Sequence, residues 1–236
     1  GSRAGARALG GFGGSDGPGR GFRTGNGGGG ASHGGQGGQS SFGPAGSIYG
    51  TAALPALVGG SGGGNGIDDE SGGGGGALSI VAGGDLTILT GVTIAMDGGT
   101  VFVNPTTGAY RSGGAGSGGS IRLQGANVRN YGTLQARGGH ASGQDPREPG
   151  QTYQADAGGG GGGGRIALVS DGEIIKGTCD VNGGTGISNG RAGLAGTVYL
   201  GPRTRSGGSL NFNSGTLTFD TAGAWSHSDG ASGVGE

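Results

Sequence analysis

Glycine occupies 72 of the 236 positions and falls in blocks, and this pattern limits how the chain can fold more than any other feature. The largest blocks cover residues 27–30, 72–76, 113–119 (with Ala115 and Ser117 interposed) and 158–164. Glycine loses more backbone freedom on folding than any other residue, so such a composition is ordinarily typical of linkers or disorder. An ordered glycine block has no side chains to bury. Its order must come from backbone N–H and C=O groups that find partners.

Two extended backbone helices can order glycine-rich chain, and glycine spacing distinguishes them. Collagen needs glycine at every third position and abundant proline. The three-residue frame breaks at Gly19 and Gly21, and the chain has only 7 prolines. Polyproline-II geometry has three residues per turn and no internal hydrogen bonds, so helices with glycine at their contacts can bond laterally. We therefore expect polyglycine-II tracts packed side by side, with residues 158–164 spanning about 20 Å at ~3.1 Å per residue.

Short β-type stretches separate the glycine blocks and recur with a regular period. Four units cover residues 72–99, 116–139, 159–184 and, more weakly, 207–223, and their first apolar residues are Leu78, Ile121, Ile166 and Leu210. Alternating apolar residues predict strands with one buried face. Second strands are expected near residues 86–88, 128 and 174, third strands near 92–94, 134–136 and 179–181, and further strands near 101–103 and 198–200. Several short strands per unit, joined by sharp turns, are typical of a β-solenoid.

We therefore expect an all-β fold: a β-solenoid or stacked β-sheet repeats with ordered polyglycine-II tracts and essentially no α-helix. Residues 1–46 form a Gly/Arg/Ser-rich N-terminal segment, which Phe12, Phe22 and Phe42 are expected to anchor. Residues 47–206 form the repeat core, and residues 207–236 form a partial fourth repeat and a Ser/Gly tail. All three parts are expected to make one folded unit.

Composition excludes several classes of function. The net charge is −1 and only 12% of residues are charged, whereas nucleic-acid binding needs a basic patch. No apolar run approaches the ~20 residues of a transmembrane span. Cys179 is the only cysteine, which excludes an intramolecular disulfide and a cysteine-based zinc site, so we expect a small buried apolar residue there. Lys176 is the only lysine, and the planar forks of the arginines are suited to pinning backbone carbonyls.

One stretch has the pattern of a calcium site. Residues 63–68 match the first six positions of the GGxGxD nonapeptide that binds Ca²⁺ in β-rolls, and Asp68, Asp69 and Glu70 offer hard oxygen ligands. However, Glu70 stands where the nonapeptide has an apolar residue, and tandem copies are absent. A solvated acidic turn is the alternative interpretation.

No catalytic or cofactor-binding residues are expected, and we predict that the chain is not an enzyme. The string Ser226-His227-Ser228-Asp229 holds residue types of a hydrolytic triad but lies in a turn-rich tail. His33 and His140 are expected on loops. Asp85, Asp97, Asp171 and Asp180 could supply the paired carboxylates of a glycosidase, but we interpret them as turn formers. The order Lys176-Gly177-Thr178 does not fit a phosphate-binding loop.

Residues 158–168, 181–186 and 195–200 resemble glycine-rich repeats of very large secreted bacterial surface proteins, and this resemblance covers roughly residues 72–223. More distantly, the run at 158–165 resembles the glycine-rich extracellular region of the anaplastic lymphoma kinase and leukocyte tyrosine kinase receptors. This chain lacks the accompanying cysteines, so no receptor role is transferred. Polyglycine-helix bundles of phage adhesins share the same principle. The resemblance implies an extracellular structural or adhesive module.

These observations predict an extracellular or cell-surface structural protein, a subunit of a self-assembling filament or matrix whose partners are copies of itself. The alternative is a surface adhesin or receptor-binding module with a cell-surface or glycan ligand. The surroundings of the large aromatic residues distinguish the two. Exposure of Tyr110, Tyr131, Tyr153 and Trp225 on one face would favour recognition, whereas burial between subunits would favour assembly.

Overall fold

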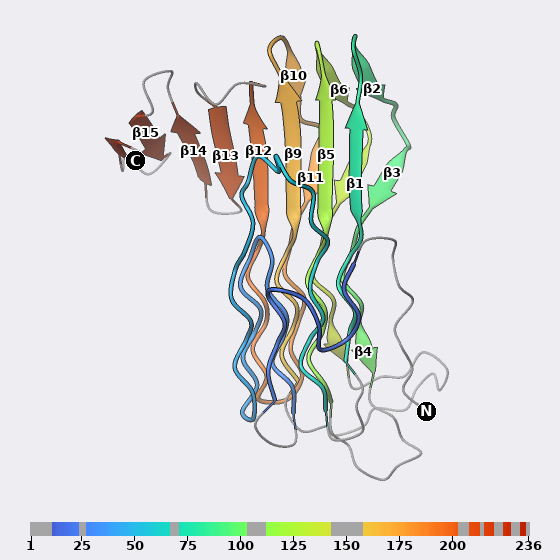
Figure 1. The fold of residues 1–236 in the computed structure, drawn as a ribbon, viewed down its shortest axis with the longest axis vertical. Helices are drawn as coiled ribbons and strands as arrows, with labels where there is room; N and C mark the ends of the chain where they lie inside the picture. Colours follow the sequence, from blue (N-terminus) through green and yellow to red (C-terminus); the bar gives the residue numbers. More distant parts are fainter. Residues whose placement is uncertain are drawn as a thin grey trace.

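A computed structural model describes residues 11–23, 27–66, 71–102, 112–142 and 158–202, and the backbone of strands between 208 and 234. The molecule is elongated and has two halves along its long axis (Figure 1). One half is built of β-strands. In the other half, glycine-rich tracts run side by side along the same axis, as continuations of the strands. No helix occurs in the described residues, and accordingly none there could cross a membrane.

Three repeat units place their strands in the same order. Unit 1 contains β1 (Ala77–Val81), β2 (Leu86–Ile88), β3 (Thr93–Ala95) and β4 (Val101–Phe102). Unit 2 contains β5 (Ser120–Gly125), β6 (Val128–Asn130), β7 (Thr133–Gln135) and β8 (Ala141–Ser142). Unit 3 contains β9 (Arg165–Ser170), β10 (Ile174–Ile175) and β11 (Thr178–Asp180). Strand β4 and its partner β8 lie among the glycine tracts, and the other strands of the units lie in the strand half (Figure 1). The sequence prediction of stacked repeat β-structure is confirmed.

Equivalent strands of successive units pair in parallel and in register. Leu78 lies opposite Ile121, and Ile121 opposite Ile166, as the spacing of the first apolar residues predicts. The second strands form one sheet (β2-β6-β10) and the third strands another (β3-β7-β11). Because every strand pairs with its counterpart one unit away, the glycine tracts between the strands are also brought into parallel layers.

The predicted fourth unit is wrong. The strand beside Ile166 is β12 (Thr197–Gly201), in which Val198 takes the position expected for Leu210. Leu210 instead belongs to β13 (Gly208–Phe212), which pairs with β12 in the antiparallel direction. The large sheet then continues antiparallel through β14 (Gly215–Phe219), β15 (Ala224–His227) and β16 (Ser232–Val234). The connection before β13 is too short for the return path that a parallel neighbour requires.

The hydrophobic core lies between the sheets, and unit 2 is its centre. Ile121, Leu123, Val128 and Leu134 are fully buried. Their counterparts in unit 1, which include Ile80, Leu86 and Ile94, pack against this core but are only partly buried. The core is therefore closed in the middle and open at the unit 1 end. On the outer face of the large sheet, Leu54 covers Ala167 and Val169.

The glycine bundle comprises the tracts that continue the strands and the N-terminal segment, at residues 11–22, 27–39, 43–47, 59–66, 71–76, 96–100, 112–119, 136–140, 158–164 and 181–196. Its central tract, 158–164, donates hydrogen bonds with a period of three residues. Gly159 and Gly162 donate to residues 28 and 31, Gly160 and Gly163 to residues 191 and 194, and Gly161 and Gly164 to residues 139 and 136, at 2.7–3.0 Å. Successive N–H groups of the central tract therefore bond to three neighbouring tracts in turn.

The tract at 112–119, and other residues of the tracts at 27–39 and 181–196, bond to the carbonyl groups of the same segment. Gly159 and Gly162 accept from Ala115 and Gly118, Gly160 and Gly163 accept from the tract at 34–38, and Gly161 accepts from Gly184. The central tract is thus enclosed by neighbouring backbone, and side chains would not fit. A Cβ added at Gly161 would lie 1.9 Å from the carbonyl oxygen of Gly116.

The N-terminal segment is part of the bundle, but two of the three aromatic residues expected to anchor it, Phe22 and Phe42, do not do so. Phe22 and Phe42 are 44% and 37% exposed. Backbone hydrogen bonds hold the segment instead, such as Gly162 N–H to Ala31 and Ala31 N–H to Ala115. Ala31, Ser32 and His33 are fully buried within it.

Candidate functional site

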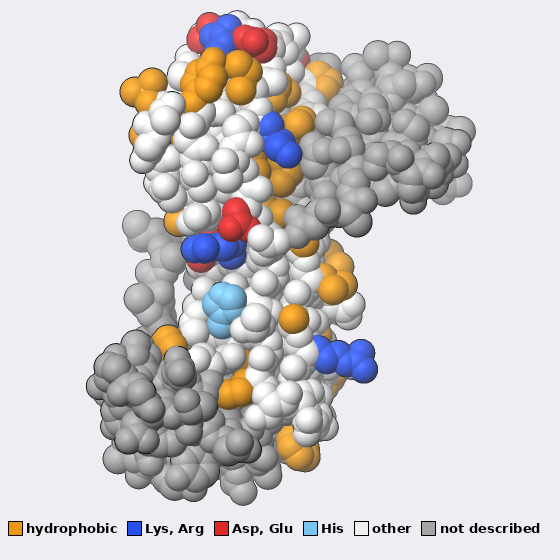
Figure 2. Space-filling model, turned by 180° about the vertical axis from the view of Figure 1, so that it is seen from behind, with side chains coloured by type: hydrophobic (Ala, Val, Ile, Leu, Met, Phe, Trp, Pro, Cys, Tyr) orange, Lys and Arg blue, Asp and Glu red, His pale blue; other side chains and the backbone are white. Residues whose placement is uncertain are grey.

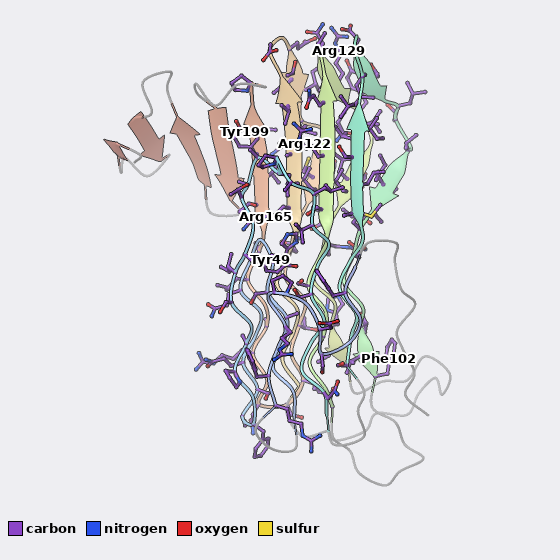
Figure 3. All side chains as sticks on the ribbon, in the orientation of Figure 1. Tyr49, Phe102, Arg122, Arg129, Arg165 and Tyr199 are labelled. Atoms are coloured by element: carbon purple, nitrogen blue, oxygen red, sulfur yellow. The ribbon has the colours of Figure 1, made fainter. Side chains whose placement is uncertain are left out.

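Buried polar side chains gather where the strand half meets the glycine bundle. Tyr49 and Arg165 lie at this level, at the base of the large sheet (Figure 3). We call His33, Tyr49, Ser61, Arg165 and Thr197 the junction cluster. Arg165 opens β9 directly after the central glycine tract, so its position is fixed by the change from tract to strand.

The Arg165 guanidinium is buried and is held by oxygen atoms that carry no formal charge. Its Nη2 lies 2.8 Å from the Tyr49 carbonyl oxygen and 3.2 Å from that of Gly50, and Nη1 donates to Thr197 Oγ1 at 3.0 Å. The residue is only 5% exposed, and burial lowers the pKa of the guanidinium from its ordinary value. An arginine stays charged under all conditions that proteins experience, so these carbonyl dipoles replace its hydration shell. The side chain ties the segment at 49–50 to two strands of the large sheet.

His33 is fully buried and stacks on Tyr49, with ring centroids 4.6 Å apart. Its Nδ1 lies 2.9 Å from the carbonyl oxygen of Gly118. Because a carbonyl oxygen only accepts hydrogen bonds, Nδ1 must carry the proton, and Nε2 is left as an acceptor. Nε2 is buried and has no hydrogen-bonding partner. Burial, and after it the charge of Arg165, lower the pKa of His33 to about 4.

Tyr49 connects the cluster to the glycine bundle. Its hydroxyl donates to the carbonyl oxygen of Gly59 and accepts from the Ser61 hydroxyl at 3.0 Å. Ser61 Oγ also accepts from the backbone N–H of Gly19, which fixes the N-terminal segment. Burial raises the pKa of Tyr49 to about 12. The hydrogen bonds of this cluster pair its buried polar atoms, apart from His33 Nε2. The His33 ring is bonded to a carbonyl oxygen rather than to a serine hydroxyl.

The buried imidazole predicts a specific pH dependence of stability. The unfolded chain protonates His33 near pH 6.5, whereas the folded protein resists protonation down to about pH 4. As the pH falls through this window, protons bind the unfolded state preferentially, and the free energy of unfolding should drop by about 3 kcal/mol. Urea unfolding followed between pH 7 and 4 measures the drop. A His33→Gln variant, which keeps an N–H donor, should show a flatter profile, and an equally steep profile in that variant would contradict the assignment.

Two rows of ion pairs cross the three units on the outside of the molecule, one on the strand half and one where the third strands continue into the glycine bundle. In the first row, Arg129 of unit 2 lies 2.8 Å from Asp85 of unit 1 and 2.6 Å from Glu173 of unit 3. In the second row, Arg137 lies 2.7 Å from Asp97 and 4.0 Å from Asp180. We call these rows the charge ladders. Figure 2 shows two groups of opposite charges on this face, one at the tip of the strand half and one lower down.

Both ladders have the same order, acid then arginine then acid. Hydrogen bonds from Asn127, and after it from Arg129, hold the pKa of the Asp85 carboxyl below its ordinary value. Bonds to Asp85 and Glu173 raise the pKa of Arg129, and the bond to Asp97 raises that of Arg137. His140 also lies between two residues of neighbouring units, both of them threonines. Its backbone N–H donates to Thr100 Oγ1 on one side, and its Nδ1 lies 3.0 Å from Thr185 Oγ1 on the other. The ladders join residues at equivalent positions of the three units, in the same register as the paired strands.

The residues of the predicted calcium site are only partly placed. Asp68, Asp69 and Glu70 lie outside the described residues. Gly63, which begins the motif, is packed in the bundle and donates its N–H to Gly72, and the Asn65 side chain accepts from the Ser71 hydroxyl at 2.8 Å. Within the described part of the chain, no group of three His, Cys, Asp or Glu side chains could hold a metal ion.

The remaining candidates fall into two groups. For Ser226 and His227 only the backbone, in β15, is described, and Ser228 and Asp229 lie outside the described residues. Asp85 directly precedes β2, Asp97 follows β3, and Asp180 ends β11. All three also form ion pairs across the units, so the turn-former interpretation is incomplete. Cys179 packs against the hydrophobic core but is only partly buried, rather than buried as predicted, and this burial raises the pKa of its thiol to about 11.

Two features of this region were not predicted. His33 lies on a bend, in keeping with the expected loop, but its complete burial was not expected. The ladder of Asp85, Arg129 and Glu173 was also not predicted, although these residues recur at the repeat spacing and could have been recognised from it. No protein-family model matches the chain, and no significant match appears among curated proteins or solved structures.

Proposed function

We propose that this chain is an extracellular structural protein, a subunit of a filament or matrix held together by backbone hydrogen bonds. In this proposal the repeat units form a short β-solenoid, and the glycine bundle is a rigid shaft of polyglycine-II tracts. The three-residue period of hydrogen bonding around residues 158–164 supports that geometry, because extended helices with three residues per turn present every third residue to the same neighbour.

The observation that carries the proposal is the presence of unpaired strand edges. Every strand of unit 1 is the last in its sheet among the described strands, and β10, β11 and β16 end sheets elsewhere. An unpaired edge presents N–H and C=O groups to other chains and invites strand addition. The low lysine content and the similarity to glycine-rich repeats of secreted surface proteins support an extracellular location.

Electron microscopy and sedimentation of the purified protein test this assignment. Uniform filaments, or a regular lattice, whose repeat matches one subunit would support it. A Val81→Lys variant alters an exposed residue at the edge of β1, and it should fold and assemble normally if copies meet through the sheet ends at β10, β11 or β16. A discrete monomer at high concentration would contradict a homopolymer.

A surface adhesin or receptor-binding module is the second candidate, and a specific observation favours it. Val81, Leu89 and Tyr131 are 62%, 65% and 49% exposed. Val81 and Leu89 lie beside the open strand edges of unit 1, and exposed apolar patches of this kind mark binding sites for other proteins. The other aromatic residues that would distinguish the two functions, Tyr110, Tyr153 and Trp225, have no described side chains.

A further inference from the structure

The open end of unit 1 is an incomplete layer of the stack. Strands β1 to β4 have neighbours on one side only among the described strands. Core residues that are fully buried in unit 2, such as Leu123 and Leu134, have partly exposed counterparts at Ile80 and Ile94 in unit 1. One more layer would bury these side chains and pair the strand edges.

A second copy of this chain does not offer a matching layer. At the unit 3 end, β12 already occupies the outer edge of β9, and the sheet continues in antiparallel strands to β16. The two three-stranded sheets end at β10 and β11, and the two-stranded sheet ends at β8. The unit 3 end of one copy therefore cannot continue the unit 1 end of another through all the sheets.

The charge ladders also disfavour a second copy. Each ladder places an arginine of unit 2 between an acid of unit 1 and an acid of unit 3. The next layer on unit 1 would lie against Asp85 and Asp97, and Asp85 is half exposed. A second copy brings Glu173 and Asp180 from its unit 3, or the same aspartates from its unit 1. Like charges directly opposite one another destabilise strand pairing.

We propose that the open edge of unit 1 binds an extended, arginine-bearing segment of a different protein, which adds one parallel β-layer. Its basic residues lie against Asp85 and Asp97 in the positions that Arg129 and Arg137 occupy on the other side of these acids. This inference rests on the proposed role of open edges in assembly and names the chemistry of the partner at one of them.

A suitable probe is a fluorescent peptide with the sequence of residues 120–139, SIRLQGANVRNYGTLQARGG, in which Arg129 and Arg137 are the two arginines at the required spacing. Fluorescence anisotropy should show saturable binding to the full chain. A peptide with glutamate in place of both arginines should bind about tenfold more weakly, and so should the native peptide to an Asp85→Asn/Asp97→Asn variant, because two charge pairs together are worth roughly 1.4 kcal/mol.

The controls separate charge recognition from loss of fold. A Glu173→Gln/Asp180→Asn variant removes the same charges at the unit 3 end and should bind the native peptide normally. An Asp85→Arg/Asp97→Arg variant should prefer the glutamate peptide. Equal binding of both peptides, or no binding of the native one, would overturn the proposal.

The failure of this inference can be told apart from failure of the proposed function. Filaments without peptide binding would refute the arginine-bearing partner and leave the structural role intact. Peptide binding by a protein that stays monomeric would refute the homopolymer and leave the partner in place. If Val81→Lys abolishes self-association at neutral pH, the occupant of the unit 1 edge is a second copy, and the proposal is overturned.

Discussion

Replacing Gly161 with alanine is expected to destabilise the protein by at least about 3 kcal/mol, enough to prevent folding of a marginally stable chain. The new Cβ would lie 1.9 Å from the carbonyl oxygen of Gly116 and 2.6 Å from its carbon. Both atoms belong to backbone that is itself hydrogen-bonded, so the tract at 112–119 cannot move aside without losing bonds. Soluble yield and urea unfolding measure the effect.

A matched control lies in the same bundle. A Cβ at Gly73 would meet nothing closer than the Phe12 carbonyl oxygen at 3.5 Å, whereas one at its neighbour Gly74 would lie 1.7 Å from the Gly60 carbonyl oxygen. Gly73→Ala should therefore be neutral or stabilise by about 0.5 kcal/mol through the lower entropy of the unfolded chain. Gly74→Ala should behave like Gly161→Ala. Normal stability of both severe variants would mean that these tracts are only linkers.

Replacing Arg165 with methionine is expected to cost about 3 kcal/mol, because it leaves the Tyr49 carbonyl and the Thr197 hydroxyl without their buried donor. An Arg165→Lys variant should lose at least as much. Lysine keeps a buried charge but lacks the planar fork that spans Tyr49, Gly50 and Thr197. Chemical denaturation of both variants gives the free energies.

The comparison of the two variants tests which property of Arg165 matters. If the lysine variant keeps the stability of the natural protein, charge alone is sufficient and the fork is not the tie. Arg122 offers a control arginine on β5. Its Nε is buried without a hydrogen-bonding partner. An Arg122→Met change should therefore be tolerated much better.

The strand half could be predicted from the sequence because its signal is periodic. Alternating apolar residues fixed the pairing of Leu78 with Ile121 and of Ile121 with Ile166. The same period failed at Leu210, because a spacing of apolar residues does not determine whether the next strand arrives parallel or antiparallel. The short connection before β13 determines the antiparallel direction.

For the glycine bundle, the sequence predicts packed glycine tracts but not their neighbours, and it does not predict the junction cluster. Composition indicates that glycine tracts pack through backbone, but glycine carries no side-chain pattern that tells which tract lies beside which. His33 illustrates the limit. Its burial depends on the stacking of Tyr49 and on the Gly118 carbonyl, which come from separate segments. Tertiary contacts of this kind leave no local signal.

Amide hydrogen exchange across residues 158–164 tests the central claim most directly. All six N–H groups from Gly159 to Gly164 donate to carbonyl oxygens of neighbouring tracts. If the tract is packed backbone, these amides should exchange as slowly as those of β9, and they should be released together on global unfolding. Exchange at the rate of an unstructured chain, while β9 remains protected, would contradict the account.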